Sequence, residues 1–119
     1  MNDDAAAVVA ARNQFASESI VSDSHFSLTL LTCPACGGQF LGIFFELIDW
    51  AGGDDSQAWF AVPMSDAEIA MLRAAGAAGA EAVLPDVTTA RKYLSYVHPR
   101  GGSSAARWQH GAVPLLPHD

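Results

Sequence analysis

The sequence predicts a small α+β domain in which two or three helices pack on a three-stranded antiparallel meander. Three β-type runs, over residues 25–32, 39–50 and 56–62, are separated by short clusters of turn residues. A helix-start signal follows the third run at Ser65. At 119 residues and 12.5 kDa the chain has the size of one domain, which can bury a single core. We therefore expect one domain over residues 1–119, with an irregular tail from about residue 100.

The N-terminus is expected to form a short helix over about residues 4–16. Asp3 or Asp4 can cap this helix, since a side-chain carboxylate accepts hydrogen bonds from the free backbone N–H groups of a first turn. The alanines that follow favour helix. The Ser- and Glu-rich stretch over residues 17–24 breaks the pattern, so we expect the helix to end before it.

The predicted sheet occupies the middle of the chain. In residues 25–32 apolar side chains alternate with Ser27 and Thr29, which is typical of a half-buried strand. Residues 39–50 carry apolar side chains on both faces of a strand, with Phe40, Phe44, Ile48 and Trp50 on one and Leu41, Ile43, Phe45 and Leu47 on the other. Such a run predicts a central strand that is covered on both sides. Residues 56–62 predict a third strand.

Helices are expected to dominate the C-terminal half. Ser65 and Glu68 have the spacing of a capping box, in which each side chain accepts from a backbone N–H group of the other residue. We expect this helix to stop near Gly76 and a short extended piece to follow over residues 83–87. Another helix is expected from Thr88 or Thr89, because Ala90, Tyr93, Leu94 and Val97 recur at helical spacing.

The charge of the chain is −7 and is unevenly distributed. Residues 1–86 hold twelve acidic side chains against two arginines, whereas residues 87–119 hold four basic side chains against one aspartate. An acidic surface favours a basic protein partner and makes nucleic-acid binding unlikely. The acidic N-terminus does not fit a secretory signal and no apolar run can span a bilayer, so we expect a soluble cytoplasmic protein without a membrane partner.

The two cysteines of the chain lie in the segment Cys33-Pro34-Ala35-Cys36-Gly37. This CPxCG turn resembles half of a zinc ribbon, in which two thiolates of one tight turn bind the same ion. A structural zinc site needs four ligands, so zinc at Cys33 and Cys36 would need two more. His98 and His110 are candidates, and a homodimer could instead complete the site with a second cysteine pair.

Two other interpretations of this turn remain open. The segment also resembles the dithiol of glutaredoxins, which implies thiol–disulfide exchange by Cys33 and Cys36. In those proteins the second cysteine belongs to a helix, whereas Gly37 and Gly38 lead here into a β-type run. The third interpretation is a metal-free turn that keeps only the ribbon geometry.

A protein-binding surface is expected around the acidic turn that follows the central strand. Asp49, Asp54 and Asp55 lie between Trp50 and Trp59, and aromatic anchors with a charged rim are typical of interfaces. The alternative is that both tryptophans pack into the core. A small anion pocket formed by Tyr93, Tyr96, His98, Arg100 and Arg107 is a weaker hypothesis.

The sequence contains no nucleophile–base motif and no phosphate-binding glycine loop, so catalysis is not indicated. The favoured function is a non-enzymatic, acidic protein-binding domain. In size, acidity and lack of catalytic motifs the chain resembles small acidic bacterial immunity proteins, which implies neutralisation of a basic toxin-type partner. A zinc-ribbon-like adaptor or regulator and a thiol–disulfide oxidoreductase are the alternatives.

Overall fold

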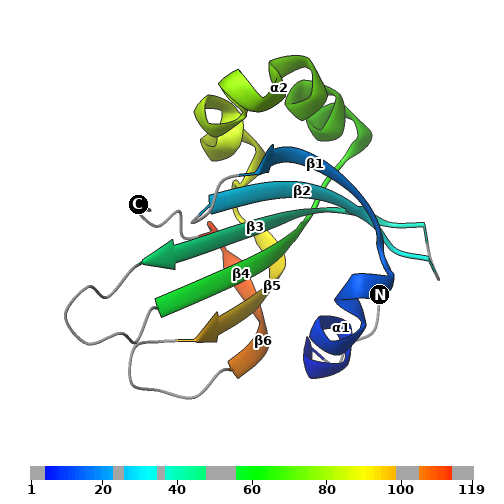
Figure 1. Ribbon diagram of the computed structural model, residues 1–119, viewed down its shortest axis with the longest axis vertical. Helices are drawn as coiled ribbons and strands as arrows, with labels where there is room; N and C mark the ends of the chain where they lie inside the picture. The colour runs from blue at the N-terminus through cyan, green and yellow to red at the C-terminus, as the bar shows by residue number, and fades with distance from the viewer. Residues whose placement is uncertain (1–4, 23–25, 35–36, 48–55, 99–104, 114–119) are drawn as a thin grey trace.

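An antiparallel sheet dominates the protein, as a computed structural model shows (Figure 1). The structure describes residues 5–22, 26–34, 37–47, 56–98 and 105–113. Within these residues six strands lie in chain order, and each strand pairs antiparallel with the next. They are β1 (Ala16–Ser22), β2 (Phe26–Thr32), β3 (Gln39–Leu47), β4 (Ser56–Pro63), β5 (Arg91–His98) and β6 (Ala105–Gly111).

Helices lie on both faces of this twisted sheet. The short helix α1 (Ala5–Ala11) is followed by a 3-10 turn over Arg12–Gln14 and packs near β5 and β6. The long helix α2 (Asp66–Val87) connects β4 to β5 and lies beside β1 at the opposite side of the sheet (Figure 1). The larger helix therefore covers one face, and the smaller helix covers part of the other.

The main core lies between the sheet and α2. Alternate side chains of β2, β3 and β4 point into it, as the two-residue period of a strand requires. Helix α2 contributes side chains on either side of a bend. The most buried large members are Phe26, Leu28, Leu41, Ile43, Phe60, Val62, Leu72 and Val87. This alternation leaves every second residue of the same strands for the other face.

Helix α2 begins at a complete capping box. The Ser65 hydroxyl accepts from the Glu68 backbone N–H at 3.2 Å, and the Glu68 carboxylate accepts from the Ser65 N–H at 2.9 Å. The helix bends at Gly76, whose φ of 64° and ψ of −171° are not helical. The predicted capping box is thus confirmed, and the helix continues beyond the predicted stop to Val87.

The predicted three-stranded meander is wrong, because the described residues form six paired strands. The stretch 17–24, expected to break the pattern, largely forms β1. The helix expected from Thr88 or Thr89 is instead β5, and β6 occupies part of the tail that we expected to be irregular. The extended piece expected at 83–87 is the end of α2.

The middle of the chain agrees with the sequence more closely. The strands expected over residues 25–32, 39–50 and 56–62 correspond to β2, β3 and β4. Segment 48–55, between β3 and β4, lies outside the described residues. None of the helices that the described residues form has the length and apolar character required to cross a bilayer.

Candidate functional site

The described residues cover the face of the sheet away from α2 only in part, and we call the part that they leave uncovered the open face. Val8 and Val9 of α1 pack against Ala61 and Leu94, which buries one end of this face. Beyond that contact lies a row of three half-buried aromatic residues, because Trp59 of β4 pairs with Phe44 of β3 and with Tyr96 of β5. The register of three strands therefore builds an aromatic surface that α1 leaves accessible.

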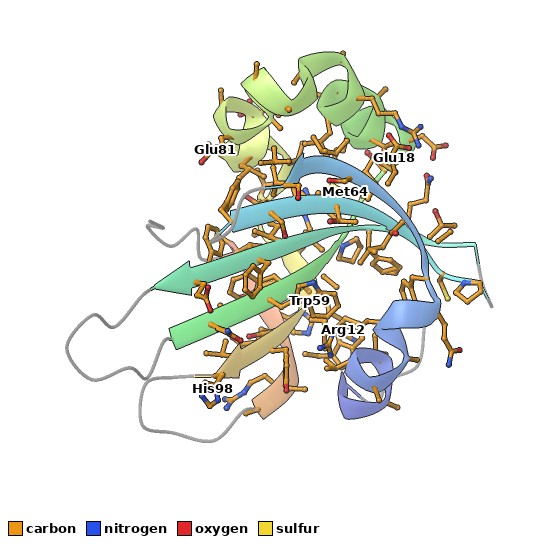
Figure 2. All side chains as sticks on the ribbon, in the orientation of Figure 1. Arg12, Glu18, Trp59, Met64, Glu81 and His98 are labelled. Atoms are coloured by element: carbon orange, nitrogen blue, oxygen red, sulfur yellow. The ribbon has the colours of Figure 1, made fainter. Side chains whose placement is uncertain are left out.

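Trp59 is the central residue of this row. A Cβ atom placed on Gly42 would lie 3.3 Å from the indole Nε1 of Trp59 and 3.1 Å from Leu31 Cδ1. Gly42 thus leaves room for the indole to lie close to the backbone of β3. The ring forms part of the open face, where Figure 2 shows it beside Arg12 and away from Glu81 on α2.

Arg12 reaches this surface from the turn after α1. Its guanidinium carbon lies 5.7 Å from the ring centroid of Trp59 and 5.5 Å from that of Tyr96. Both distances are within the range of cation–π attraction. One nitrogen, Nη1, donates to the carbonyl oxygen of Val9 at 2.9 Å. Two aromatic rings and a backbone carbonyl therefore hold the guanidinium in place.

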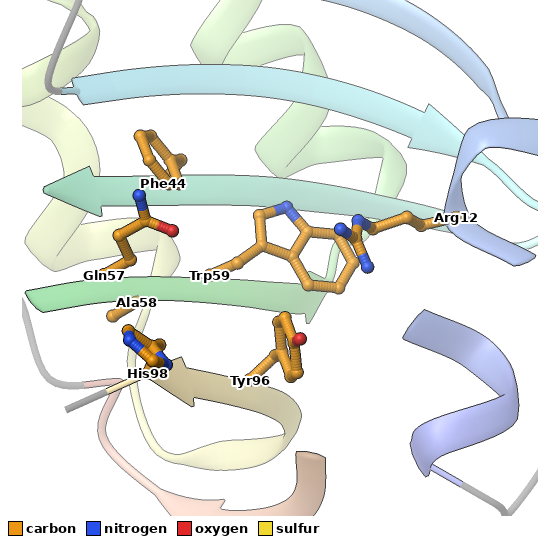
Figure 3. Close-up of a pocket in the computed structure, with 7 residues that line it drawn as sticks. All are labelled: Arg12, Phe44, Gln57, Ala58, Trp59, Tyr96 and His98. Atoms are coloured by element: carbon orange, nitrogen blue, oxygen red, sulfur yellow. The ribbon is translucent and has the colours of Figure 1, made fainter. Parts of the chain in front are cut away.

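A pocket of about 430 Å³ opens on the aromatic row. Figure 3 shows Phe44, Gln57 and His98 on one side of Trp59, with Arg12 on the other and Tyr96 next to the indole. A smaller hollow of about 260 Å³ shares Arg12 and Trp59 and continues over Phe15, Ser17, Thr29 and Leu31. The larger volume is in the usual range for ligand pockets. Its walls combine aromatic surface with a few polar groups.

No protein-family model, no curated protein and no solved structure matches this chain. Its function is therefore inferred from the chemistry of its own residues.

The predicted partner-binding residues divide into two groups. Trp59 is described, and it lies half-buried on the open face beside Arg12. Asp49, Trp50, Asp54 and Asp55 lie outside the described residues. Trp59 lies outside the α2 core but packs against two smaller clusters of buried residues, one of Val8, Val9, Ala61 and Leu94 and one of Leu31, Cys33 and Phe40. Its role as a partner anchor therefore stays a prediction.

Cys33 occupies a tight turn between β2 and β3. Its backbone N–H donates to the Gly38 carbonyl at 2.8 Å, and the Gly37 N–H donates to the Cys33 carbonyl at 2.9 Å. Gly37 has a φ of 71°, which glycine adopts without strain. The Cys33 side chain is buried next to Leu31 and Phe40, and Cys36 lies outside the described residues.

The structure does not bring the candidate zinc ligands together. His110 pairs with Lys92 on β5, six residues before His98, which separates the two histidines by roughly 20 Å along the strand direction. Cys33 follows β2, four strand spacings or roughly 19 Å from β6. No group of three metal-ligating side chains occurs among the described residues. Zinc shared by two copies through Cys33 and Cys36 stays a prediction, and zinc analysis of a Cys36→Ser variant would test it.

The local structure after the turn also bears on the redox alternative. Gly38 leads directly into β3, so no helix begins at this point to stabilise a thiolate. The described part of the turn therefore lacks the helix found at the dithiol of glutaredoxins.

The sequence partly indicated the pocket. The hypothesis of an anion pocket named Tyr96 and His98, which line it, but Tyr93 points into the α2 core and Arg100 lies outside the described residues. The cation that lines this pocket is Arg12, which the sequence-based hypothesis did not include. The signal was weak, because a lone arginine in an alanine-rich helix usually marks a solvated surface.

Proposed function

We propose that this chain is a non-enzymatic protein-binding domain whose interface is the open face. The observation that supports this function is the grouping of Arg12, Trp59 and Tyr96 beside a hollow surface. Tryptophan, tyrosine and arginine are the residues most enriched among those that dominate the energy of protein interfaces. A row of rings with a fixed guanidinium provides large contact area at a low cost in side-chain entropy.

The fold supports the same function through rigidity. Phe44, Trp59 and Tyr96 are each fixed by a central strand with neighbours on both sides. A surface carried by paired strands changes little on binding, so association loses less conformational entropy than it would with a mobile loop. We therefore expect the partner to meet a preformed surface.

Neutralisation of a basic toxin-type partner is a narrower form of this proposal. It is supported by the charge of −7 and by the acidic residues Asp49, Asp54 and Asp55. These carboxylates would form a second contact region, or would replace the open face as the interface. A partner that binds only through them would leave Trp59 and Arg12 without a role in binding.

Site-specific photocrosslinking tests the proposal. Gln57 is an exposed residue of the open face, and Met71 is exposed on α2 at the other side of the molecule. With p-benzoylphenylalanine at residue 57, irradiation of cells that produce the protein should give an adduct of one discrete mass. The same group at residue 71 should give none. An adduct at residue 71 alone, or at neither position, would contradict the proposed interface.

A further inference from the structure

Arg12 has hydrogen-bonding capacity that its neighbours in the described structure leave unused. A guanidinium carries five N–H donors. Within the described residues, the contact from Nη1 to the Val9 carbonyl is its only hydrogen bond, and no carboxylate pairs with it. Arg73 and Arg91, in contrast, each bind a glutamate through two nitrogens. Arg12 is thus an oriented cation with unused donors at the wall of a pocket.

The described residues that line the pocket add no negative charge next to Arg12. They are Arg12 itself, three aromatic residues, Ala58, Gln57 and His98. Glu46 of β3 accepts a hydrogen bond from Gln57 Nε2 at 2.7 Å. Gln57 and His98 line the pocket in the strand row beyond the aromatic row, at the end away from Arg12 (Figure 3). An anionic group is favoured at the Arg12 end.

We infer that the protein partner inserts one carboxylate side chain, next to an aromatic side chain, against the guanidinium of Arg12. This inference rests on the proposed protein-binding function and names the chemistry of the partner. Arginine and carboxylate form paired, charge-assisted hydrogen bonds whose planar geometry also fixes orientation. The neighbouring aromatic side chain packs on Phe44 and Trp59.

Two observations determine the form of the occupant. The larger and smaller hollows continue past Trp59 on both sides and share Arg12. Two adjoining hollows that share Arg12 and Trp59 fit side chains of an extended peptide segment better than one compact small molecule. The charge of −7 would repel a strongly acidic segment, so we expect the bound segment to carry a single carboxylate.

Three tripeptides with blocked ends test this chemistry. N-acetyl-Phe-Glu-Phe-amide carries one carboxylate, and the peptides with Gln or Lys in the middle are nearly isosteric controls of neutral or positive charge. Binding is followed by NMR at the Nε–H of Arg12 and the Nε1–H of Trp59. We expect the Glu peptide to shift both signals and to bind about tenfold more tightly than the Gln peptide. The Lys peptide should bind most weakly.

Variants of Arg12 assign the preference to its side chain. Arg12→Gln should bind the Glu and Gln peptides equally, and Arg12→Lys should keep only part of the preference because an ammonium lacks the planar fork. Circular dichroism confirms that both variants are folded. The inference is overturned if the Glu peptide gives no shift at millimolar concentration, if the Gln peptide binds as tightly, or if the preference survives in Arg12→Gln.

A small-molecule control tests whether the occupant of the pocket is a peptide. If 3-phenylpropionate binds as tightly as the Glu peptide, the pocket takes small aryl carboxylates and the peptide assignment is wrong. Failure of these binding experiments would not contradict the proposed protein-binding function. A partner that crosslinks at residue 57 would still support the open face as an interface, even if no peptide showed a charge preference.

Discussion

At the scale of single residues, Glu68 shows how one side chain connects three elements. Its carboxylate caps α2 through the Ser65 N–H and accepts from both terminal nitrogens of Arg91 at 2.9 and 2.7 Å. Arg91 also donates to the Pro63 carbonyl at 2.8 Å. The end of β4, the start of α2 and the start of β5 therefore meet at one ion pair. The sequence predicted the cap but not Arg91, because no local pattern reports a contact between residues 23 positions apart.

This ion pair predicts a pH dependence of stability. The hydrogen bond from Arg91 is the main cause that lowers the pKa of Glu68 from 4.5 to about 2. A carboxyl group whose pKa is depressed on folding stabilises the protein above its unfolded pKa, and this contribution is lost as the pH falls from about 4.5 to 2. At neutral pH it amounts to about 1–2 kcal/mol, because solvent at this partly buried pair screens part of the interaction.

The Glu68→Gln variant isolates the contribution of this pair. Glutamine can still cap the helix, but it has no charge for Arg91. In urea denaturation, the variant should be less stable than the wild type at pH 7, and the difference should shrink toward zero near pH 2. A difference that stayed constant between these pH values would show that the charge of Glu68 does not stabilise the fold.

At the scale of elements, the sequence predicted strands well only where long apolar side chains follow a clear two-residue period. β2, β3 and β4 carry long apolar side chains in alternation, so their two-residue period is visible. β5 has apolar or aromatic residues on both faces, and Tyr93, Leu94 and Val97 match a helical period as well as a strand. β1 and β6 are the edges of the described sheet and are rich in polar and small residues. Pairing with a neighbouring strand makes them strands, which a pattern within one segment cannot report.

The bend in α2 predicts opposite effects for two neighbouring glycines. Gly76 has a positive φ, and a Cβ atom there would meet nothing within 4 Å, so Gly76→Ala should destabilise the protein by about 1–3 kcal/mol through backbone strain alone. Gly79 has no positive φ, and its added Cβ would make an ordinary 3.4 Å contact with Ala75. Gly79→Ala should therefore stabilise the protein by roughly 0.5–1 kcal/mol.

Urea midpoints of the two variants measure these effects against the wild type. The comparison is matched, since both changes add one methyl group to the same element. Equal stabilisation by both substitutions would mean that α2 runs straight through Gly76.

At the scale of the whole molecule, the sheet separates the face that α2 covers from the open face, which we propose as the binding surface. Helix α2 covers one side completely enough to bury Phe26, Phe45 and Phe60, whereas the short α1 covers only an end of the other. The sequence showed that the central strand is apolar on both faces, but not which face would be covered less. Which face is covered less depends on the lengths of α1 and α2. A helix was predicted where β5 lies, so the sequence did not reveal the extent of the sheet. Trp59 could thus be named from the sequence as a candidate site residue, whereas Arg12, which lies beside it, could not.

The two faces should respond differently to the loss of a phenylalanine ring. Phe60 is 2% exposed, contacts Phe45 and Tyr93 edge-on and fills the α2 core, so Phe60→Ala should cost about 3–5 kcal/mol. Phe44 lies on the adjacent strand but lines the pocket of the open face, where its ring is only half-buried. Phe44→Ala should cost clearly less, roughly 1–2 kcal/mol, because less apolar area returns to water and the space it leaves opens to solvent.

Binding should show the reverse order. If the open face is the interface, Phe44→Ala should weaken binding of N-acetyl-Phe-Glu-Phe-amide, because it removes part of the aromatic row that the peptide contacts. Phe60→Ala, measured under conditions where it remains folded, should bind with nearly unchanged affinity. Urea denaturation and NMR titration of the same two variants therefore test the assignment of both faces. A Phe44→Ala variant that loses as much stability as Phe60→Ala would place that ring in a closed core and remove the open face as a binding surface.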